Sequence, residues 1–200
     1  MVAFLAWWFH DVAPFIILCG QLWIPLFWLA VHPAIGFWRR YPRACYYVVA
    51  PSVLLVTWAG LLLPYRWWLA DRFAQHWLAV AVGILLNLID LWLMVQIKRV
   101  LGMRVLVGLP ELRPQSHAGQ TAASGIYAKV RHPRYLGMML AWIGAALLAG
   151  ATRLLLLVLV FIGLALVVTE FEERELLKRL GPAYADYRRR VPRLLPRLWT

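Results

Sequence analysis

Two groups of charged residues in the carboxyl-terminal half of the chain have the composition of a ligand-binding site. The first is the basic run Arg131-His132-Pro133-Arg134, which comes immediately before an apolar segment. The second is the acidic run Glu170-Phe171-Glu172-Glu173, which comes immediately after the next apolar segment. Cationic side chains bind carboxylates and phosphates, and paired carboxylates bind cations or ammonium groups. Together the two runs predict a site for a ligand that carries charges of both signs.

The apolar segments between these runs are expected to bring them together. They cover about 135–150 and 154–169 and are joined at Ala151-Thr152-Arg153. As helices they form an antiparallel hairpin, with its turn on one side of a membrane and both charged runs on the other. Proline is favoured in the first turn of a helix, so Pro133 is expected to begin the first helix with His132 near its cap. The free amide groups at that helix end favour an anion.

The composition indicates an integral membrane protein. Apolar residues make up 63% of the chain and the mean hydropathy is +0.68, more than a soluble surface tolerates. Charged residues are scarce, and long uncharged runs separate them. The net charge of +12 does not indicate a nucleic-acid partner, because the basic residues flank apolar segments instead of forming one stripe. We therefore predict an all-α polytopic membrane protein whose oligomeric state is left open.

Five membrane spans account for the apolar segments. The first three cover about 12–31, 44–63 and 77–95, each close to the roughly 20 residues that a bilayer core requires. The hairpin supplies the fourth and fifth. A long polar stretch, 96–134, precedes the hairpin, and a charged tail follows it with an amphipathic helix at about 172–180 that Gly181-Pro182 ends. We divide the chain into three amino-terminal spans (1–96) and a cofactor-binding catalytic region (97–200).

The distribution of basic residues predicts the orientation. With the amino terminus outside, 18 of the 21 basic residues face the cytoplasm, and only Arg66, Arg72 and Arg153 lie outside. Cytoplasmic loops of membrane proteins carry such an excess of lysine and arginine. We therefore expect a multi-pass protein of the cell (inner) membrane with both charged runs on its cytoplasmic side.

Other polar or small residues within the apolar segments allow two interpretations. Asn87 and Asp90 lie one helical turn apart in the third span and are either functional or a structural hydrogen bond between helices. Small residues on one face of the fourth helix predict close packing with a neighbouring helix; they are Gly137, Ala141, Gly144, Ala145 and Ala149. The histidines His10, His32 and His76 are interpreted as interfacial. No phosphate loop, dinucleotide glycine fingerprint or metal motif is present in the sequence.

The carboxyl-terminal 75 or so residues resemble the isoprenylcysteine carboxyl methyltransferase family of integral-membrane methyltransferases. One matching motif is S-G-I-Y-A-K-V-R-H-P-R-Y-L-G, from Ser124 to Gly137. The second motif agrees in spacing and consists of Glu172-Glu173, Gly181, Tyr184, Tyr187, Val191-Pro192 and Leu195-Pro196. Phospholipid methyltransferases and bacterial thiol methyltransferases look similar over this region. One departure is a histidine that the family often carries six residues before the glycine of S-G-x-Y; here His117 lies eight residues before Gly125.

This resemblance implies a methyltransferase that uses S-adenosyl-L-methionine, a ligand with a carboxylate, an ammonium and a sulfonium. It implies that Arg131, Glu172 and Glu173 are catalytic. It also implies a cofactor pocket formed by Tyr127, Arg131, His132, Tyr135, Gly137, Glu172, Glu173, Tyr184 and Tyr187. The acceptor is expected to be lipophilic and to enter between the helices, while a small thiol remains an alternative.

A different enzyme class shares part of this pattern. Membrane sterol-type reductases that use NADPH have a similar R-H-P-x-Y-x-G run, usually with Asn before the tyrosine and Glu after the glycine. This chain has Arg134 and Met138 at those positions, and its Glu172-Glu173 pair also favours the methyltransferase. A non-catalytic protein that retains the scaffold is a third, weaker alternative.

Overall fold

The computed structural model describes residues 2–74, 76–106, 112 and 123–197. In this part of the chain the backbone is helical with no β-strand, apart from one isolated bridge between Arg72 and Ala151. Four helices are long and apolar enough to cross a membrane: Ala3–Arg40, Pro42–Leu62, Trp77–Leu101 and Thr152–Leu180. A fifth apolar helix, Pro133–Ala149, is shorter. The predicted all-α polytopic class is therefore confirmed.

The first long helix consists of several shorter elements. They are α1 (Val2–Trp7), the π-helix η1 (Trp8–Val12), α2 (Ala13–Gln21), α3 (Trp23–Val31), the 3₁₀ turn η2 (His32–Ala34) and α4 (Ile35–Arg40). Prolines explain the interruptions, because proline has no amide hydrogen for the bond to the preceding turn. Pro14 follows η1, Pro25 follows the junction of α2 and α3, and Pro33 lies within η2. The expected span 12–31 is thus the middle of a longer helix.

The second long helix comprises α5 (Pro42–Ala44), the π-helix η3 (Cys45–Val49) and α6 (Ala50–Leu62). A short helix, α7 (Tyr65–Trp68), leads to α8 (Trp77–Leu106), which continues well beyond the expected end at residue 95. The continuation contains Lys98 and Arg99, and both residue types favour helix. The 3₁₀ turn η5 (Gly125–Ala128) then precedes the hairpin.

The hairpin has the antiparallel arrangement expected from the sequence. Helix α10 (Pro133–Ala149) begins at the predicted proline with His132 as its cap residue, and it ends at Gly150 in the left-handed conformation. Helix α11 (Thr152–Leu180) follows after Ala151. Residues 172–180 are helical and the helix ends at Gly181, with φ +57°, as expected; they are not a separate helix, however, but continue α11. The tail instead forms α12 (Pro182–Arg190).

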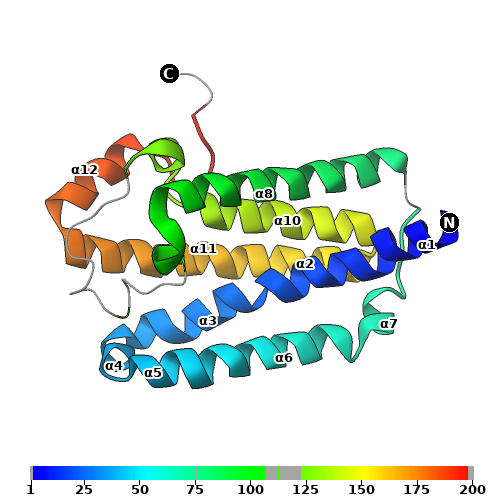
Figure 1. Ribbon diagram of the computed structural model, residues 1–200, viewed down its shortest axis with the longest axis horizontal. Helices are drawn as coiled ribbons and strands as arrows, with labels where there is room; N and C mark the ends of the chain where they lie inside the picture. Colours follow the sequence, from blue (N-terminus) through cyan, green and yellow to red (C-terminus); the bar gives the residue numbers. More distant parts are fainter. Residues whose placement is uncertain (1, 75, 107–111, 113–122, 198–200) are drawn as a thin grey trace.

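The helices run side by side along the long axis of the molecule, with α4, α5 and α12 at one end and α1 and α7 at the other (Figure 1). We call the first the motif end, because His132 and Glu173 lie there, and the second the turn end, because the hairpin turns there. At the turn end, the amide of Thr152 donates to the carbonyl of Asp71 at 2.9 Å. At the same end, the side chain of Arg72 forms an ion pair with Asp11, and the side chain of Arg153 donates a hydrogen bond to the carbonyl of Trp67.

Helix α10 lies at the centre of the bundle. Its Ala141, Trp142 and Ala145 are fully buried, whereas leucines of α6, α8 and α11 such as Leu55, Leu88 and Leu159 are more than half exposed. Exposed apolar side chains are compatible with a hydrocarbon environment. The helical backbone is compatible with it too, because its hydrogen bonds are made within each helix. The outer helices therefore have the surface that a bilayer solvates.

Glycines allow α10 to approach α8 closely, as the small face of α10 predicts. A Cβ atom on Gly144 would lie 2.4 Å from Nδ2 of Asn87, and one on Gly137 would lie 2.5 Å from Oδ1 of Asp90. The other carboxylate oxygen of Asp90 accepts a hydrogen bond of 2.9 Å from Gln21 of α2. Asp90 thus has the structural role that was one of its two interpretations, a hydrogen bond between helices.

Candidate active site

The two charged runs meet at the motif end around one buried carboxylate. Glu173 of α11 is 1% exposed, and its Oε1 lies 3.0 Å from Nε2 of His132 and 2.9 Å from Nη2 of Arg131. Two arginines of the tail complete the surroundings: Nε of Arg188 lies 3.1 Å from Oε2, and Nε of Arg193 lies 3.9 Å from Oε1. We call these five residues the Glu173 cluster. It joins the start of α10, the last turns of α11 and the tail.

The backbone holds the tail against the first motif. The amides of Arg131 and His132 donate to the carbonyls of Pro192 and Arg193 at 2.9 and 3.0 Å. Nη1 of Arg131 also donates to the carbonyl of Arg188 at 2.7 Å. The Val-Pro segment of the tail therefore runs directly beside the Arg-His-Pro segment, which explains why both recur in one sequence pattern.

Two buried tyrosines of α12 lie near the cluster, close enough to interact electrostatically with Glu173 and Arg131. Tyr184 and Tyr187 are 2% and 5% exposed, and they pack against Leu176, Leu177 and Val191. The hydroxyl of Tyr187 donates a hydrogen bond of 2.7 Å to the carbonyl of Tyr127 in η5. Burial raises the pKa of Tyr187 to about 12 and raises that of Tyr184 as well, so both phenols stay protonated at neutral pH.

The two glutamates of the acidic pair have different surroundings. Glu173 is enclosed by basic side chains, whereas the side chain of Glu172 is 23% exposed, with Oε2 3.8 Å from Nδ1 of His132. The sequence suggested a separate acidic pole for a ligand ammonium. Only Glu172 is partly open to a ligand, because the basic residues already compensate the charge of Glu173.

The remaining predicted site residues divide into two groups. The ring of Tyr135, 6% exposed, lies 5.9 Å from that of His132, and Tyr127 is partly buried in η5. Gly137 instead lies against Asp90 of α8, where a larger residue would collide. Its expected part in the cofactor pocket, like the roles of the other site residues, stays a prediction. His117 lies outside the described residues.

Sequence reasoning missed the contribution of the tail arginines. Arg188 and Arg193 counted only toward membrane orientation, yet both contact Glu173. Their position was a usable signal, because they flank the Val-Pro pair of the second motif. The contacts themselves could be found only in the folded structure, because 15 or more positions separate each arginine from Glu173 and the chain reverses direction at Gly181.

The cluster fits a ligand with charges of both signs. The Nε atoms of Arg131 and Arg193 are buried and have no hydrogen-bond partner among the described residues. Buried donors of this kind are usually satisfied, so an acceptor such as a ligand carboxylate can complete them. Glu172 offers a carboxylate to a cationic group nearby. The donor set is therefore compatible with S-adenosylmethionine.

Comparison with known proteins identifies the family. Residues 78–183, which include all of α10 and α11 and nearly all of α8, match the phospholipid methyltransferase family. The chain is 35% identical over 181 residues to methanethiol S-methyltransferase 2 of Bradyrhizobium diazoefficiens, covering 82% of this chain and 64% of that protein. It is 29% identical over 200 residues to methanethiol S-methyltransferase of Mycobacterium tuberculosis, covering 96% of this chain and 69% of that protein. The chain thus spans about two thirds of the length of these relatives. No solved structure matches it significantly. On the evidence of the family match over more than half of its length, the chain belongs to the phospholipid methyltransferase family.

Proposed function

We propose that this protein transfers a methyl group from S-adenosylmethionine to the sulfur of a small thiol at the motif end of its helix bundle. The observation that carries the proposal is the Glu173 cluster, which unites both family motifs in one buried, mixed-charge site. The choice of a thiol rests on the two relatives, both of which are named methanethiol S-methyltransferases.

Each part of the site has a task in this proposal. Arg131 and Arg193 bind the carboxylate of the cofactor through their unsatisfied Nε donors. Glu172 attracts its ammonium group, and Glu173 holds the arginines and His132 in place. When bound, S-adenosylmethionine supplies an electrophilic methyl group on a positively charged sulfur. Alignment of the nucleophile with that methyl group supplies much of the rate, because a fixed geometry replaces a random encounter.

Cofactor choice is the first test. Calorimetric titration of the purified protein in detergent is expected to show binding of S-adenosylmethionine and none of NADPH. Binding of NADPH alone would contradict the proposal and favour the sterol-type reductases that share part of the first motif.

A lipophilic acceptor is the second candidate, and two observations favour it. The family match is to phospholipid methyltransferases, and the outer faces of α6, α8 and α11 are apolar and exposed. A lipid-anchored acceptor would concentrate in the membrane beside the site, at roughly 0.8 kcal/mol for each buried methylene.

The length of the acceptor separates the two candidates. Methyl transfer from radiolabelled cofactor is measured with methanethiol, a long-chain alkanethiol and a phospholipid amine. The thiol proposal expects methanethiol to be turned over at least as well as the long-chain thiol. Turnover that rises with chain length, or that occurs only with the phospholipid, would replace it with the lipophilic acceptor.

A further inference from the structure

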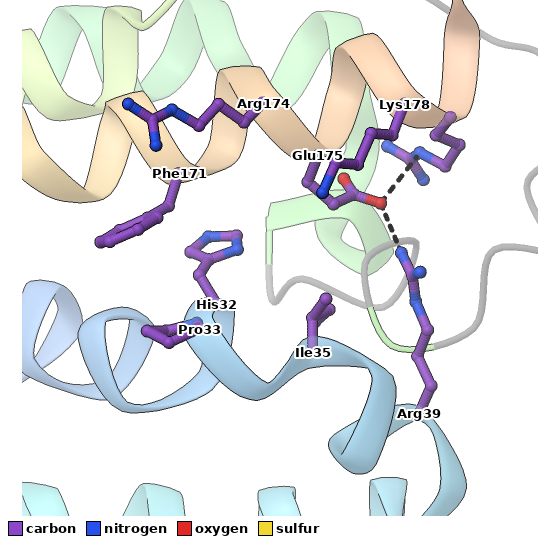
Figure 2. A pocket seen from close by; sticks show the side chains of 9 residues that line it. His32, Pro33, Ile35, Arg39, Phe171, Arg174, Glu175 and Lys178 are labelled. Atoms are coloured by element: carbon purple, nitrogen blue, oxygen red, sulfur yellow. Dashed lines mark hydrogen bonds and ion pairs between the residues drawn. The ribbon is translucent and has the colours of Figure 1, made fainter.

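A cavity of about 430 Å³ lies on the other side of α11 from the Glu173 cluster (Figure 2). The segment from η2 to α4 forms one of its walls, and the last turns of α11 form the other. Glu173 contacts the start of α10 and the tail, whereas Glu175, two positions later, contacts Arg39 of α4. Because residues two positions apart on a helix face nearly opposite directions, the cavity is separate from the proposed cofactor site.

Basic side chains outnumber acidic ones around this cavity. Glu175 is the single carboxylate that lines it, and two arginines, Arg39 and Arg179, pair with that carboxylate. Lys178 also lines the cavity and forms no ion pair within the described part of the chain. The walls therefore carry a net positive charge, which stabilises a bound anion.

The cavity opens to the surface beside Arg174 and Lys178. Both of these residues are exposed, whereas His32 and Glu175, which also line the cavity, are only 7% and 8% exposed. Arg174 pairs with Glu170, so Lys178 supplies the positive charge at this mouth that no described carboxylate neutralises. Figure 2 shows the side chain of Lys178 reaching back across Glu175. An anion that enters from the surface therefore meets Lys178 first.

The position of the cavity along α11 corresponds to the level of lipid headgroups. The apolar run of α11 ends at Thr169, and the residues of this helix that line the cavity lie just beyond it, within 171–179. At about 1.5 Å per residue, Arg174 lies roughly 8 Å beyond the run. The headgroup layer extends about 5–8 Å on each side of the hydrocarbon core. Phe37 in α4 and Tyr41 at its end are 56% and 49% exposed, and aromatic residues are enriched at that level.

An apolar track on α11 leads along the helix to the cavity. Val160 and Val167 are 61% and 46% exposed. Phe171, Arg174 and Lys178 follow Val167 at spacings of four, three and four positions, and Val160 precedes it by seven. These spacings place all five residues on one face of the helix. A molecule whose hydrocarbon chains lie along the two valines thus presents its headgroup to the basic mouth of the cavity.

We infer that this cavity binds the phosphate of an anionic membrane phospholipid whose acyl chains lie along the exposed face of α11. Basic pockets between transmembrane helices are a recurrent type of site for such headgroups. The lipid is bound there without being methylated, because the cavity and the proposed cofactor site lie on opposite sides of α11. Its role is to hold α4 against α11. The inference does not depend on the proposed function, and its test requires neither cofactor nor acceptor.

The choice of ligand is tested by native mass spectrometry of the purified, delipidated protein in detergent, which measures the affinity for the first bound lipid. Phosphatidylglycerol is compared with phosphatidylcholine and with glycerol 1-phosphate. We expect phosphatidylglycerol to bind several-fold more tightly than phosphatidylcholine, because only its headgroup has a net negative charge. Glycerol 1-phosphate should bind more weakly than phosphatidylglycerol, because it has no chains to contact the apolar track.

The variant Lys178→Gln tests the position of the lipid. A basic residue near an anionic lipid typically contributes about a factor of five to its binding, so the affinity for phosphatidylglycerol should fall about fivefold. Lys178→Arg should retain the affinity of the wild type. The variant has no ion pair to lose within the described part of the chain, so the unfolding temperature of the delipidated protein should stay unchanged.

Lys98→Gln is the matched control. Lys98 is also an exposed lysine without an ion pair to a described residue, but it belongs to α8 and does not line the cavity. Its substitution removes the same charge from the protein and should leave the affinity for the first phosphatidylglycerol close to that of the wild type.

Three results would overturn the inference. Equal affinity of the wild type and Lys178→Gln, or equal losses in Lys178→Gln and Lys98→Gln, would show that the lipid does not occupy this cavity. Phosphatidylcholine bound as tightly as phosphatidylglycerol would exclude selection of an anionic headgroup. Glycerol 1-phosphate bound as tightly as phosphatidylglycerol would identify a soluble phosphate compound as the ligand. None of these results bears on methyl transfer, so the proposed function is decided by its own tests.

Discussion

At the scale of single residues, Glu173 connects more of the motif end than any other described side chain. Its carboxylate contacts Arg131 and His132 at the start of α10 and Arg188 in α12, so it joins two distant segments to α11. A buried charge is tolerated only when it is paired, because burial removes the stabilising water. The adjacent Glu172 is partly exposed and is free to interact with a ligand. Neighbouring residues of one motif thus have different surroundings.

The variant Glu173→Gln is expected to weaken both the fold of the motif end and cofactor binding. It leaves the buried Arg131 without its counter-ion, and breaking a buried pair typically costs about 3–5 kcal/mol. The partly exposed Arg188 regains water, so we expect the lower part of that range. Thermal unfolding and calorimetric titration with S-adenosylmethionine measure the two effects.

Asp186→Asn is the control, because its partner Arg189 is exposed and such surface pairs contribute about 0–1 kcal/mol. Glu172→Gln should weaken cofactor binding while leaving the unfolding temperature near that of the wild type. Equal cofactor affinity in the wild type, Glu172→Gln and Glu173→Gln would exclude the acidic pair from the site.

At the scale of elements, the contact of α10 with α8 determines where the first motif lies. Gly144 and Gly137 let the two helices approach until side chains of α8 fill the space of a missing Cβ. In lipid there is little hydrophobic drive between helices, so such close packing supplies much of the association. The start of α10, and with it His132, is therefore positioned by residues far from the charged cluster.

The variant Gly144→Ala is expected to destabilise the bundle by about 1–3 kcal/mol, the usual cost of overpacking. The added carbon would lie 2.7 Å from the carbonyl oxygen of Gly83, a backbone atom that cannot rotate away. Unfolding in detergent, followed by circular dichroism, measures the change.

Gly163→Ala in α11 is the matched control, because nothing lies within 4 Å of its added Cβ. Alanine is a better helix former than glycine, so this variant should be neutral or more stable by up to about 1 kcal/mol. A Gly144→Ala protein as stable as Gly163→Ala would show that the contact of α8 and α10 is looser than described.

At the scale of the whole molecule, the two ends of the bundle differ in charge. The turn end holds Arg66, Arg72 and Arg153, and the motif end holds the Glu173 cluster and the arginines of α12. From this difference the positive-inside rule predicts that the motif end faces the cytoplasm. Orientation in the membrane stays a prediction, as does the division of the chain at residue 96.

Cysteine labelling tests this orientation in intact cells. A membrane-impermeant maleimide should label Ala70→Cys at the turn end but not Arg190→Cys at the motif end, until the membrane is opened. Both positions are exposed, and the native Cys19 and Cys45 are buried, so their background should be low. Labelling of Arg190→Cys alone would reverse the predicted topology.

The sequence by itself determined the class of fold, the hairpin and the two motifs that meet at its mouth. These features depend on local patterns: apolar runs of a given length, Pro133 at a helix start and charges beside the runs. The residues at which the helices end were harder to predict from the sequence. Residues 170–180 have the charges of a surface segment, yet they continue α11 because charged helix formers extend a helix until a residue such as Gly181 stops it.

Only the tertiary structure decided which charged groups are paired and which remain open. Glu172 and Glu173 are equivalent in sequence, but α11 turns about 100° between them, so one enters the basic cluster and the other does not. The sequence around His32 offers only Trp28, one helical turn earlier, to cover its ring. The rest of its burial comes from α11, more than 130 positions later in the chain, which packs against the end of α3 and η2.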